Sequence, residues 1–271
     1  MKSNKKLEIL ICNDDGITAP GIYHLIQAAK EFGNLTIVAP DSPQSGMGHA
    51  ISVGKPLRLN KVHLEGETEG WACSGTPVDC IKLATGVILK HKPDLILSGI
   101  NHGANSSINI FYSGTMSAAI EGAIEGIPSM GFSLLNWSMD ADFTASKEIV
   151  KILLQKFLEN PFPPHVALNV NIPDLPFERI KGIRITRQAQ GRWVEEFDHR
   201  KDPYGRDYYW LTGKFCLEEE GEDTDIWALE NGYVSVCPVE IDATAHHAIP
   251  SFNMWRLPHH FEHPSQVEEK F

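Results

Sequence analysis

The sequence lacks the features that mark several large functional classes. Basic residues are scarce: 24 Lys and Arg stand against 35 Asp and Glu, which gives a formal net charge of −11. A broad surface that follows the phosphates of a nucleic-acid polymer is therefore not expected, although a bound metal can reverse the charge within one cleft. The five cysteines form an odd number and show no C-x-x-C spacing, so we expect no disulfide framework and a reduced, cytoplasmic protein.

Long apolar runs are also absent. The first apolar stretch, residues 7–12, is interrupted by Glu8 and ends at Asn13. It is too short for the hydrophobic part of a signal peptide or for a membrane span. We therefore expect neither secretion nor a membrane partner.

Two nucleotide-binding motifs are missing as well. The sequence contains no G-x-x-x-x-G-K-[ST], and the first strand is not followed by G-x-G-x-x-G, which argues against a P-loop and against the usual dinucleotide-binding fold. Kinases and dehydrogenases are excluded on this ground. The acids Asp14 and Asp15 are adjacent and follow Asn13, whereas phosphatases with an aspartyl nucleophile use a D-x-D spacing.

The chain does contain a regular alternation of strand and helix patterns. Short apolar runs typical of strands occur at residues 7–12, 34–40, 93–100, 127–134, 165–173 and 183–188. Helical spacing occurs at residues 19–33, 76–89, 113–126 and 145–160. This alternation predicts a single α/β domain over residues 1–271, with helices on both faces of a mostly parallel, Rossmann-like sheet.

The composition changes in the last third of the chain. Residues 188–225 are aromatic and charged and alternate around a Pro-Tyr-Gly turn, which predicts a long projecting β-hairpin. Residues 246–271 are expected to form a C-terminal arm. The Trp and Tyr residues between positions 193 and 210 have two interpretations, because such side chains stack on nucleobases and also anchor subunit interfaces.

Polar residues gather in three loops that follow predicted strands. These loops are residues 13–16, 40–52 and 98–115. In an open parallel sheet the carboxyl ends of the strands form the ligand crevice, so the three loops are expected to converge. They offer carboxylates, Ser hydroxyls and Asn oxygens, which suit Mg²⁺ or Mn²⁺ better than Zn²⁺. A dication would neutralise the adjacent acids Asp14 and Asp15; the alternative is that these acids only cap a turn.

A possible anion site lies at the end of the third loop. Ser113, Gly114 and Thr115 precede a helix rich in small residues, where N–H groups and hydroxyls can hold a phosphate; the alternative is a simple helix cap. A plain cap is the preferred interpretation of residues 74–80. His49 and His102 are candidates for a proton donor to a leaving alcohol, or are structural. Five histidines near the C-terminus resemble a metal cluster, but their setting favours a solvated segment: His246, His247, His259, His260 and His263.

Five segments, taken in order, resemble the survival protein E (SurE) family of 5′/3′-nucleotidases. They are ILICNDDGITAPGI, VAPDSPQSGMGHAIS, SGTPVDCI, PDLILSGINHGAN and YSGTMSAAIEGAIEGIP. Two later segments, DPYGRDYYW and TDIWALENGYVSVCPVEID, are similar to the hairpin and the late strand of the family. The resemblance spans most of the chain, and the combined segments are much more specific than any one of them.

The resemblance implies a three-layer α/β/α sandwich whose sheet is mixed at one edge. It also implies metal-dependent hydrolysis of nucleoside 5′- and 3′-monophosphates, with exopolyphosphatase activity in some members, and dimers or tetramers that exchange arms and hairpins. The family motif assigns one divalent cation, Mg²⁺ or Mn²⁺, to the ligands Asp14, Asp15, Ser45 and Asn101. It assigns the phosphate to Asn105, Ser113, Gly114 and Thr115.

The sequence departs from the family pattern near this site. Ser107 and Asn109 stand where Gly and Asp are usual, and Met116 and Ser117 stand for Val and Gly; these departures bear on substrate preference more than on the reaction. For catalysis we expect Asp14 or Asp15 to accept the proton of the water that attacks phosphorus. The alternative function is a receiver-like, Mg²⁺-binding signalling module without hydrolase activity, which also begins with two acids after its first strand but is about half as long.

Overall fold

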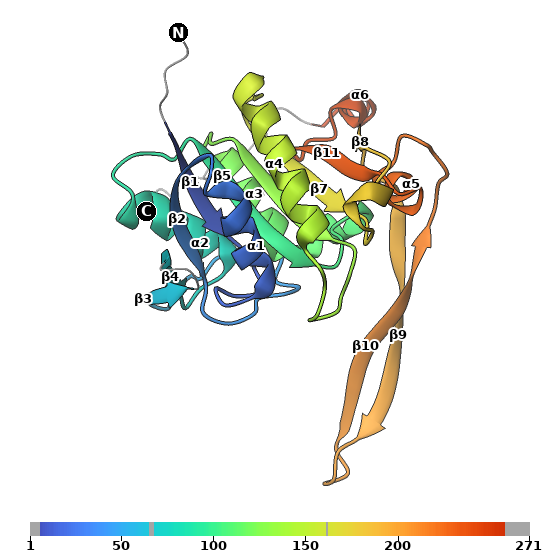
Figure 1. The fold of residues 1–271 in the computed structure, drawn as a ribbon. Coiled ribbons are helices and arrows are strands. Elements are labelled where there is room, and N and C mark those ends of the chain that lie inside the picture. Colours follow the sequence, from blue (N-terminus) through green and yellow to red (C-terminus); the bar gives the residue numbers. More distant parts are fainter. Residues whose placement is uncertain (1–5, 65–67, 161, 258–271) are drawn as a thin grey trace, which may run out of the picture. The chain divides into compact units, whose positions relative to one another are not determined.

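The computed structural model describes residues 6–64, 68–160 and 162–257 (Figure 1). The chain divides into two compact units, Met1–Ile241 and Asp242–Phe271. The second unit begins close to the start of the C-terminal arm predicted at residues 246–271, and residues 258–271 of that arm lie outside the described residues. None of the helices in the described part of the chain is long and apolar enough to cross a membrane.

The strands and helices follow the predicted alternation. The strands are β1 (Leu7–Cys12), β2 (Gly33–Pro40), β3 (Leu59–Leu64), β4 (Thr68–Cys73), β5 (Leu95–His102), β6 (Ser129–Leu134), β7 (Val166–Ile172), β8 (Ile183–Ile185), β9 (Gly191–Lys201), β10 (Asp207–Leu217) and β11 (Val234–Glu240). The helices are α1 (Pro20–Ala29), α2 (Pro77–Leu83), α3 (Gly114–Ile124), α4 (Thr144–Glu159) and α5 (Asp225–Glu230), and α6 (Ile249–Asn253) in the second unit. Short helical turns are η1 (Ala84–Ile88), η2 (Ser107–Tyr112), η3 (Phe177–Arg179) and η4 (His246–Ala248).

Nine strands form one twisted sheet in the order β3-β4-β2-β1-β5-β6-β7-β11-β8. The six strands from β4 to β7 in this order are all parallel. Antiparallel pairs occur toward both ends of the sheet, where β3 pairs with β4 and β11 pairs with β7, whereas one mixed edge was expected. The β3-β4 pair was not predicted because its apolar residues are separated by polar ones and form no continuous apolar run.

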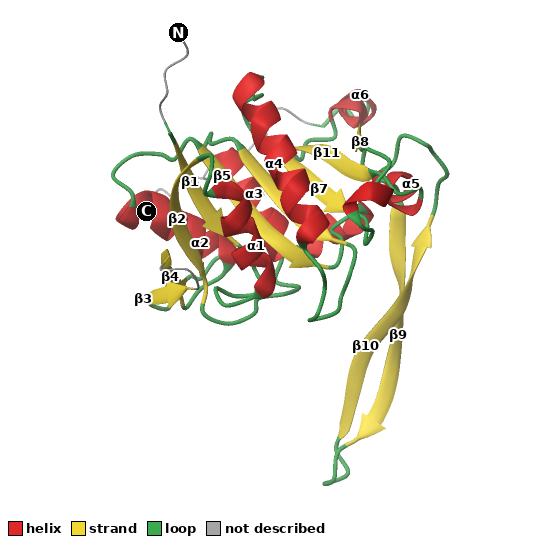
Figure 2. Cartoon of the chain, viewed as in Figure 1, coloured by secondary structure: helices red, strands yellow, loops and turns green. Residues whose placement is uncertain are grey.

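Helices cover both faces of the sheet, which confirms the three-layer α/β/α prediction (Figure 2). The side chains of β1 alternate between the two layers because successive residues of a strand point to opposite faces. Ile9 and Ile11 belong to the core cluster beneath α1 and α4, while Leu10 and Cys12 belong to the cluster beneath α2 and α3. All four side chains are buried, so both faces of β1 are covered.

The first helix is shorter than predicted. It was expected to extend through Gly33, but α1 ends at Ala29 and Gly33 begins β2. A Cβ atom on residue 33 would lie 2.1 Å from the carbonyl oxygen of Leu7. Glycine is therefore required by the close pairing of β2 with β1 rather than by a helix end.

The order of the strands locates a crevice. From β1 the chain moves through α1 to β2 on one side, while β5 lies on the other side of β1. The loops after β1 and β5 therefore leave the sheet in different directions and open a space between them, which is where open α/β sheets bind ligands. This is the edge at which the polar loops were predicted to meet.

The predicted hairpin is present as a separate two-stranded sheet. β9 and β10 pair antiparallel, and in Figure 1 they extend away from the nine-stranded sheet. The Asp202 carboxylate closes the turn by accepting hydrogen bonds from the N–H groups of Tyr204 and Arg206, at 2.8 and 3.0 Å. Most hairpin residues are exposed, as expected for a ribbon covered on neither face by its own chain.

Candidate active site

The three polar loops converge at the carboxyl ends of the strands. The N–H of Gln44, in the loop after β2, donates to the carbonyl oxygen of Asp14 at 2.8 Å. The N–H of Gly48 in the same loop donates to the carbonyl oxygen of Tyr112 at 3.2 Å. These backbone hydrogen bonds connect the loop after β2 to the loops after β1 and β5.

Asp14 lies buried against the N-terminus of α3. Its Oδ1 accepts a hydrogen bond from the hydroxyl of Thr115, and a Cβ on residue 114 would lie 2.6 Å from the Asp14 Cβ, so Gly114 permits this close packing. Burial raises the pKa of Asp14 from 3.8 to about 6, and the charge of Asp15 adds to the increase while the Thr115 hydrogen bond opposes it. The carboxylate is thus held at a helix N-terminus in an environment that favours its neutral form.

Asp15 lies beside Asp14 and is held by His102. Its Oδ2 accepts from the His102 Nδ1 at 3.0 Å and from the His102 backbone N–H at 3.3 Å. The imidazole also packs edge-on against the buried ring of Phe143, with ring centroids 5.1 Å apart. Because Asp15 is partly accessible while His102 is buried, the histidine orients the carboxylate from behind.

The other two predicted metal ligands differ in how firmly they are held. The Asn101 side chain donates from Nδ2 to the carbonyl oxygen of Gly103 at 2.7 Å, which leaves its amide oxygen as the ligand atom. Ser45 is exposed and follows Gln44, which is hydrogen-bonded to Asp14. Within the described residues, no group of three or more His, Cys, Asp and Glu side chains is arranged to hold a metal ion, so a site here depends on Ser and Asn oxygens.

The predicted phosphate residues are largely engaged with the protein itself. Asn105 donates from Nδ2 to the Ser133 hydroxyl at 2.8 Å, and its backbone N–H donates to the Asn171 side chain at 2.7 Å. Ser113 is the N-cap of α3, because its hydroxyl accepts from the N–H of Met116 at 3.0 Å. Ser113 therefore caps α3, and the N–H groups of the first turn of α3 are candidate donors to an anion.

The two candidate histidines occupy different environments. His102 contacts the Asp15 carboxylate through Nδ1, and its Nε2 is buried and has no hydrogen-bond partner among the residues described. His49 contacts Glu121 through Nε2 at 2.9 Å. Each imidazole thus has an acidic partner on one ring nitrogen.

Glu121 was not singled out in the sequence, where it is one charge within a helix of small residues. It is buried on α3 and also forms an ion pair with Lys82 of α2. Burial raises its pKa, but the hydrogen bonds from His49 and Lys82 outweigh this effect and the pKa is lowered overall. The contact with His49 ties the loop after β2 to α3, so Glu121 is a support for the loop that carries Ser45.

Two further predicted features are local. The segment at residues 74–80 forms a helix cap: the Thr76 hydroxyl accepts from the Asp79 N–H at 3.1 Å, and the Asp79 carboxylate accepts from the Thr76 N–H at 2.9 Å. In the second unit, His246 contacts the Asp242 carboxylate at 2.6 Å. Three other histidines of the suspected tail cluster lie outside the described residues: His259, His260 and His263.

The family model described as "Survival protein SurE" matches residues 9–195 of this chain, which include all three loops. The chain belongs to the SurE family. A protein named 5′-nucleotidase SurE from Flavobacterium psychrophilum is 57% identical over 251 residues, which cover 92% of this chain and 97% of the relative. A protein of the same name from Phocaeicola vulgatus is 44% identical over 258 residues, covering 95% and 99% of the two chains.

A solved structure shows the same fold. The SurE protein from Aquifex aeolicus matches with a TM-score of 0.80 and 40% identity, covering 92% of this chain and 99% of that chain. The architecture of this SurE-family chain, a mostly parallel sheet between helices with a separate hairpin, is therefore that of a known SurE structure.

Two of the departures of this SurE chain from the family pattern, Ser107 and Asn109, contact the hairpin. The Ser107 hydroxyl donates to the carbonyl oxygen of Ala189 at 2.8 Å, and the Asn109 side-chain oxygen accepts from the indole N–H of Trp193 at 2.8 Å. Both residues lie in η2, in the loop after β5. The loop that carries the site is thereby joined to the base of β9.

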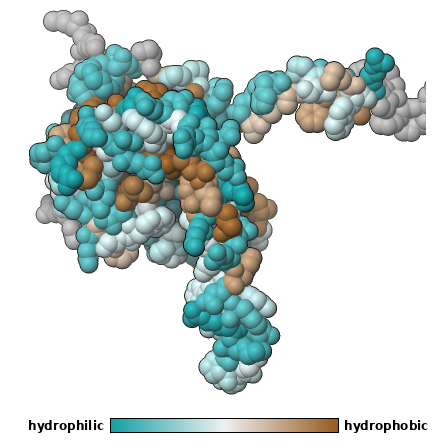
Figure 3. Space-filling model, turned by 90° about the vertical axis from the view of Figure 1, so that its right-hand side faces the viewer, coloured by the Kyte–Doolittle hydropathy of each residue, from teal (hydrophilic) through white to brown (hydrophobic). Residues whose placement is uncertain are grey.

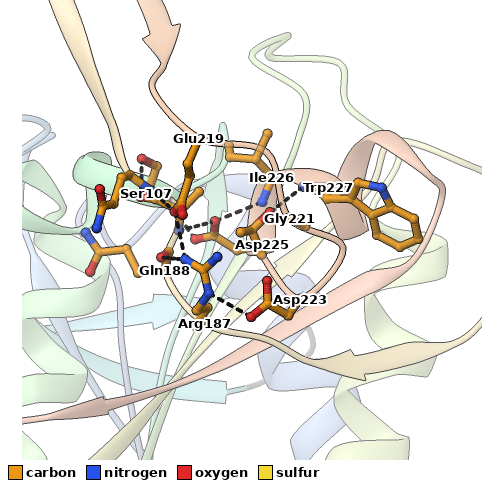
Figure 4. Close-up of polar contacts among 12 residues, drawn as sticks. Ser107, Arg187, Gln188, Glu219, Gly221, Asp223, Asp225, Ile226 and Trp227 are labelled. Carbon is orange, nitrogen blue, oxygen red and sulfur yellow. Dashed lines mark hydrogen bonds and ion pairs between the residues drawn. The ribbon is translucent and has the colours of Figure 1, made fainter.

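A buried acid strengthens this junction (Figure 4). The Asp225 carboxylate accepts hydrogen bonds from the N–H groups of Ser107, Ala189 and Ile226, at 2.7, 3.0 and 2.8 Å. Burial raises its pKa although these donors oppose the increase. Figure 4 also shows Arg187 between Glu219 and Asp223, which brace the other side of the hairpin base.

Proposed function

We propose that the chain is a metal-dependent 5′-nucleotidase that hydrolyses nucleoside monophosphates to nucleoside and phosphate. The names of its relatives support this substrate class. The observation that carries the proposal is the pair Asp14 and Asp15 at the N-terminus of α3, in the crevice where β1 and β5 diverge. We extend the proposal to 3′-monophosphates and short polyphosphate, because the crevice is defined by phosphate and metal chemistry rather than by one sugar position.

The residues fit a hard divalent cation. Asp14, Asp15, Asn101 and Ser45 would hold one Mg²⁺ or Mn²⁺ through oxygen atoms, the ligands that these ions prefer. The raised pKa of Asp14 reflects burial and the neighbouring charge of Asp15, and a dication would relieve both. When bound, such an ion supplies Lewis-acid chemistry and makes an attacking water more acidic.

The protein side chains have separate tasks in the proposed reaction. Thr115 fixes the Asp14 carboxylate, and His102 fixes that of Asp15. The more accessible Asp15 is the better placed of the two to accept the proton of the attacking water. The N–H groups at the start of α3 stabilise charge on the phosphoryl oxygens, where one well-aimed donor contributes about 3 kcal/mol in comparable sites.

We also propose that the chain works in the cytoplasm as a dimer or tetramer. Its five free cysteines, four of them buried, support a reducing compartment. Large apolar side chains of the hairpin are exposed, among them Phe197 and Tyr209, which supports contact with another copy of the chain.

Release of inorganic phosphate tests the proposed activity. Purified protein is incubated with 5′- and 3′-nucleoside monophosphates and short polyphosphate, in Mg²⁺, Mn²⁺ or EDTA. We expect phosphate release with metal, and loss of release in EDTA and in Asp14→Asn, while the exposed-site control Asp142→Asn keeps full activity. If no phosphate is released under any condition, the proposed activity is wrong and a receiver-like binding role is favoured. If borohydride traps a phosphorylated aspartate, the reaction uses an aspartyl nucleophile instead of an attacking water.

A further inference from the structure

A cavity of about 590 Å³ lies between the base of the hairpin and the loops of the active site. Its size is within the range of small-molecule sites, which measure about 300–1,000 Å³. The lining residues used below are Gly46, Tyr112, Trp193, Glu195, Leu211 and Gly213. All of them belong to the first unit.

The cavity begins next to the proposed metal and phosphate residues. Gly46 directly follows Ser45, and Tyr112 directly precedes Ser113. The hydrogen bond from the Gly48 N–H to the Tyr112 carbonyl oxygen holds these two walls together. Two residues of its lining, Gly46 and Tyr112, are thus adjacent in the chain to residues proposed to hold the metal and the phosphate.

One face of the hairpin forms the opposite wall. Cross-strand partners share a face, and the pairs are Trp193 with Phe215, Glu195 with Gly213, and Phe197 with Leu211. Gly213 has no side chain, so the space across from Glu195 stays open. Figure 3 shows that the tip of the hairpin is mainly hydrophilic, whereas hydrophobic residues occur where the hairpin joins the body.

The aromatic groups of the cavity are exposed, and Trp193 is held in position. Trp193 is 42% exposed and Tyr112 is 54% exposed. The Trp193 indole is fixed by its hydrogen bond to Asn109 at 2.8 Å and by an edge-on contact with Phe215, with centroids 5.9 Å apart. Asp225 fixes the strand that carries Trp193, because it binds the N–H of Ala189 at the hairpin base. An exposed aromatic side chain that is held rigid in this way is a stacking surface prepared for a flat ligand.

We propose that this cavity is the nucleoside subsite of the proposed nucleotidase, with the base stacked on Trp193 and Tyr112. Glu195 has carboxylate oxygens that accept hydrogen bonds from ribose hydroxyls or from an exocyclic amine. Larger rings gain more from stacking, so purine nucleotides are preferred over pyrimidine nucleotides. The assignment rests on the proposed function for the phosphate end, but the binding of a nucleoside alone tests it separately.

The test compares Trp193→Ala and Trp193→Phe with Trp210→Ala, a control that removes an exposed Trp from the opposite face of the same hairpin. The first readout is the ratio of kcat/KM for AMP to kcat/KM for ribose 5-phosphate, which lacks a base. Loss of one stacking partner should lower this ratio about 5- to 100-fold in Trp193→Ala. Trp193→Phe should restore part of it, and Trp210→Ala should leave it unchanged.

The second readout is the binding of adenosine in EDTA, followed by saturation-transfer NMR, which needs no hydrolysis. Adenosine binding that weakens in Trp193→Ala and persists in Trp210→Ala supports the subsite, even if the wild type cleaves no monophosphate and the proposed function fails. If adenosine binding and the AMP ratio are both unchanged in folded Trp193→Ala, the assignment of the nucleoside subsite is wrong, and the proposed nucleotidase activity is unaffected. A change of oligomeric state in Trp193→Ala, with adenosine binding intact, also overturns the subsite and assigns the cavity to an interface between copies.

Discussion

Replacing Asp14 by Asn should remove activity and yet stabilise the metal-free protein at neutral pH. Asp14 is buried, and its pKa in the folded protein is raised from 3.8 to about 6. Because one pKa unit corresponds to about 1.36 kcal/mol, ionisation of this buried group costs about 3 kcal/mol in the folded state relative to the unfolded chain. Asn cannot ionise and does not bear this cost.

The pH dependence has a definite sign. A carboxyl whose pKa is raised on folding contributes its full stability below the unfolded pKa of 3.8 and loses it as the pH rises through about 6. The wild type therefore weakens over this interval and the Asn variant does not. The Thr115 hydroxyl donates to a neutral amide oxygen less strongly than to a carboxylate, which offsets about 1 kcal/mol. Above about pH 7, the free energy of unfolding of metal-free Asp14→Asn should therefore exceed that of the wild type by about 2 kcal/mol.

Urea unfolding in EDTA, at about pH 4 and about pH 7.5, measures this difference. The gain should be present at the higher pH and absent at the lower one. Asp142→Asn serves as the control, because hydrogen bonding from Thr144 lowers the pKa of Asp142 and its replacement should give no gain at neutral pH. If Asp14→Asn is less stable than the wild type at about pH 7.5 in EDTA, the electrostatic account of the paired acids is wrong.

Three further predictions concern the supports of the site. Glu121→Gln should lower the free energy of unfolding at neutral pH by about 1.5–3 kcal/mol, because Lys82 and His49 lose a charged partner. The pKa of Glu121 is lowered from 4.5, so the difference in free energy of unfolding between wild type and variant should shrink as the pH falls below that value. Urea titrations at several pH values measure it, and a difference that does not change with pH would contradict the ion-pair role. Asp225→Ala leaves two buried N–H groups and one partly buried N–H group without this acceptor, and it should cost about 3 kcal/mol in the same titration. Asp223→Ala should change the free energy of unfolding little. Phe197→Ser combined with Tyr209→Ser should shift the protein toward monomer in light scattering; an unchanged mass would remove the hairpin from the proposed interface.

The fold was predictable where the chain makes regular apolar patterns. The buried strands β1, β5 and β6 are short continuous runs, and their positions between amphipathic segments were enough to give the layered architecture and the crevice. The β3-β4 pair gave no such signal, because its apolar residues are interspersed with Lys, His, Thr and Glu and form no continuous run. Its pairing with β2 is decided by tertiary contacts that the local sequence does not encode.

The meeting of the polar loops was predictable, but the orientation of their side chains was not. The alternation of strands and polar loops indicated that the loops of Asp14 and Tyr112 would lie close together. Both loops are hydrogen-bonded through their backbones to the loop after β2, as expected. The alternation did not indicate that the Thr115 hydroxyl would face Asp14, or that His49 would face Glu121. Both contacts depend on which way a side chain leaves its loop or helix, and this direction is set by neighbouring elements far apart in sequence.

The most direct test of the account is the position of a bound Mn²⁺ ion in a crystal of this protein. Anomalous diffraction at the manganese edge should give one peak per chain, within coordination distance of the carboxylates of Asp14 and Asp15 and of the Asn101 side-chain oxygen, with Ser45 facing it. The peak should be missing in crystals of Asp14→Asn grown in the same way. A strong peak elsewhere on the chain, or full activity with no peak beside these acids, would contradict the metal-dependent mechanism.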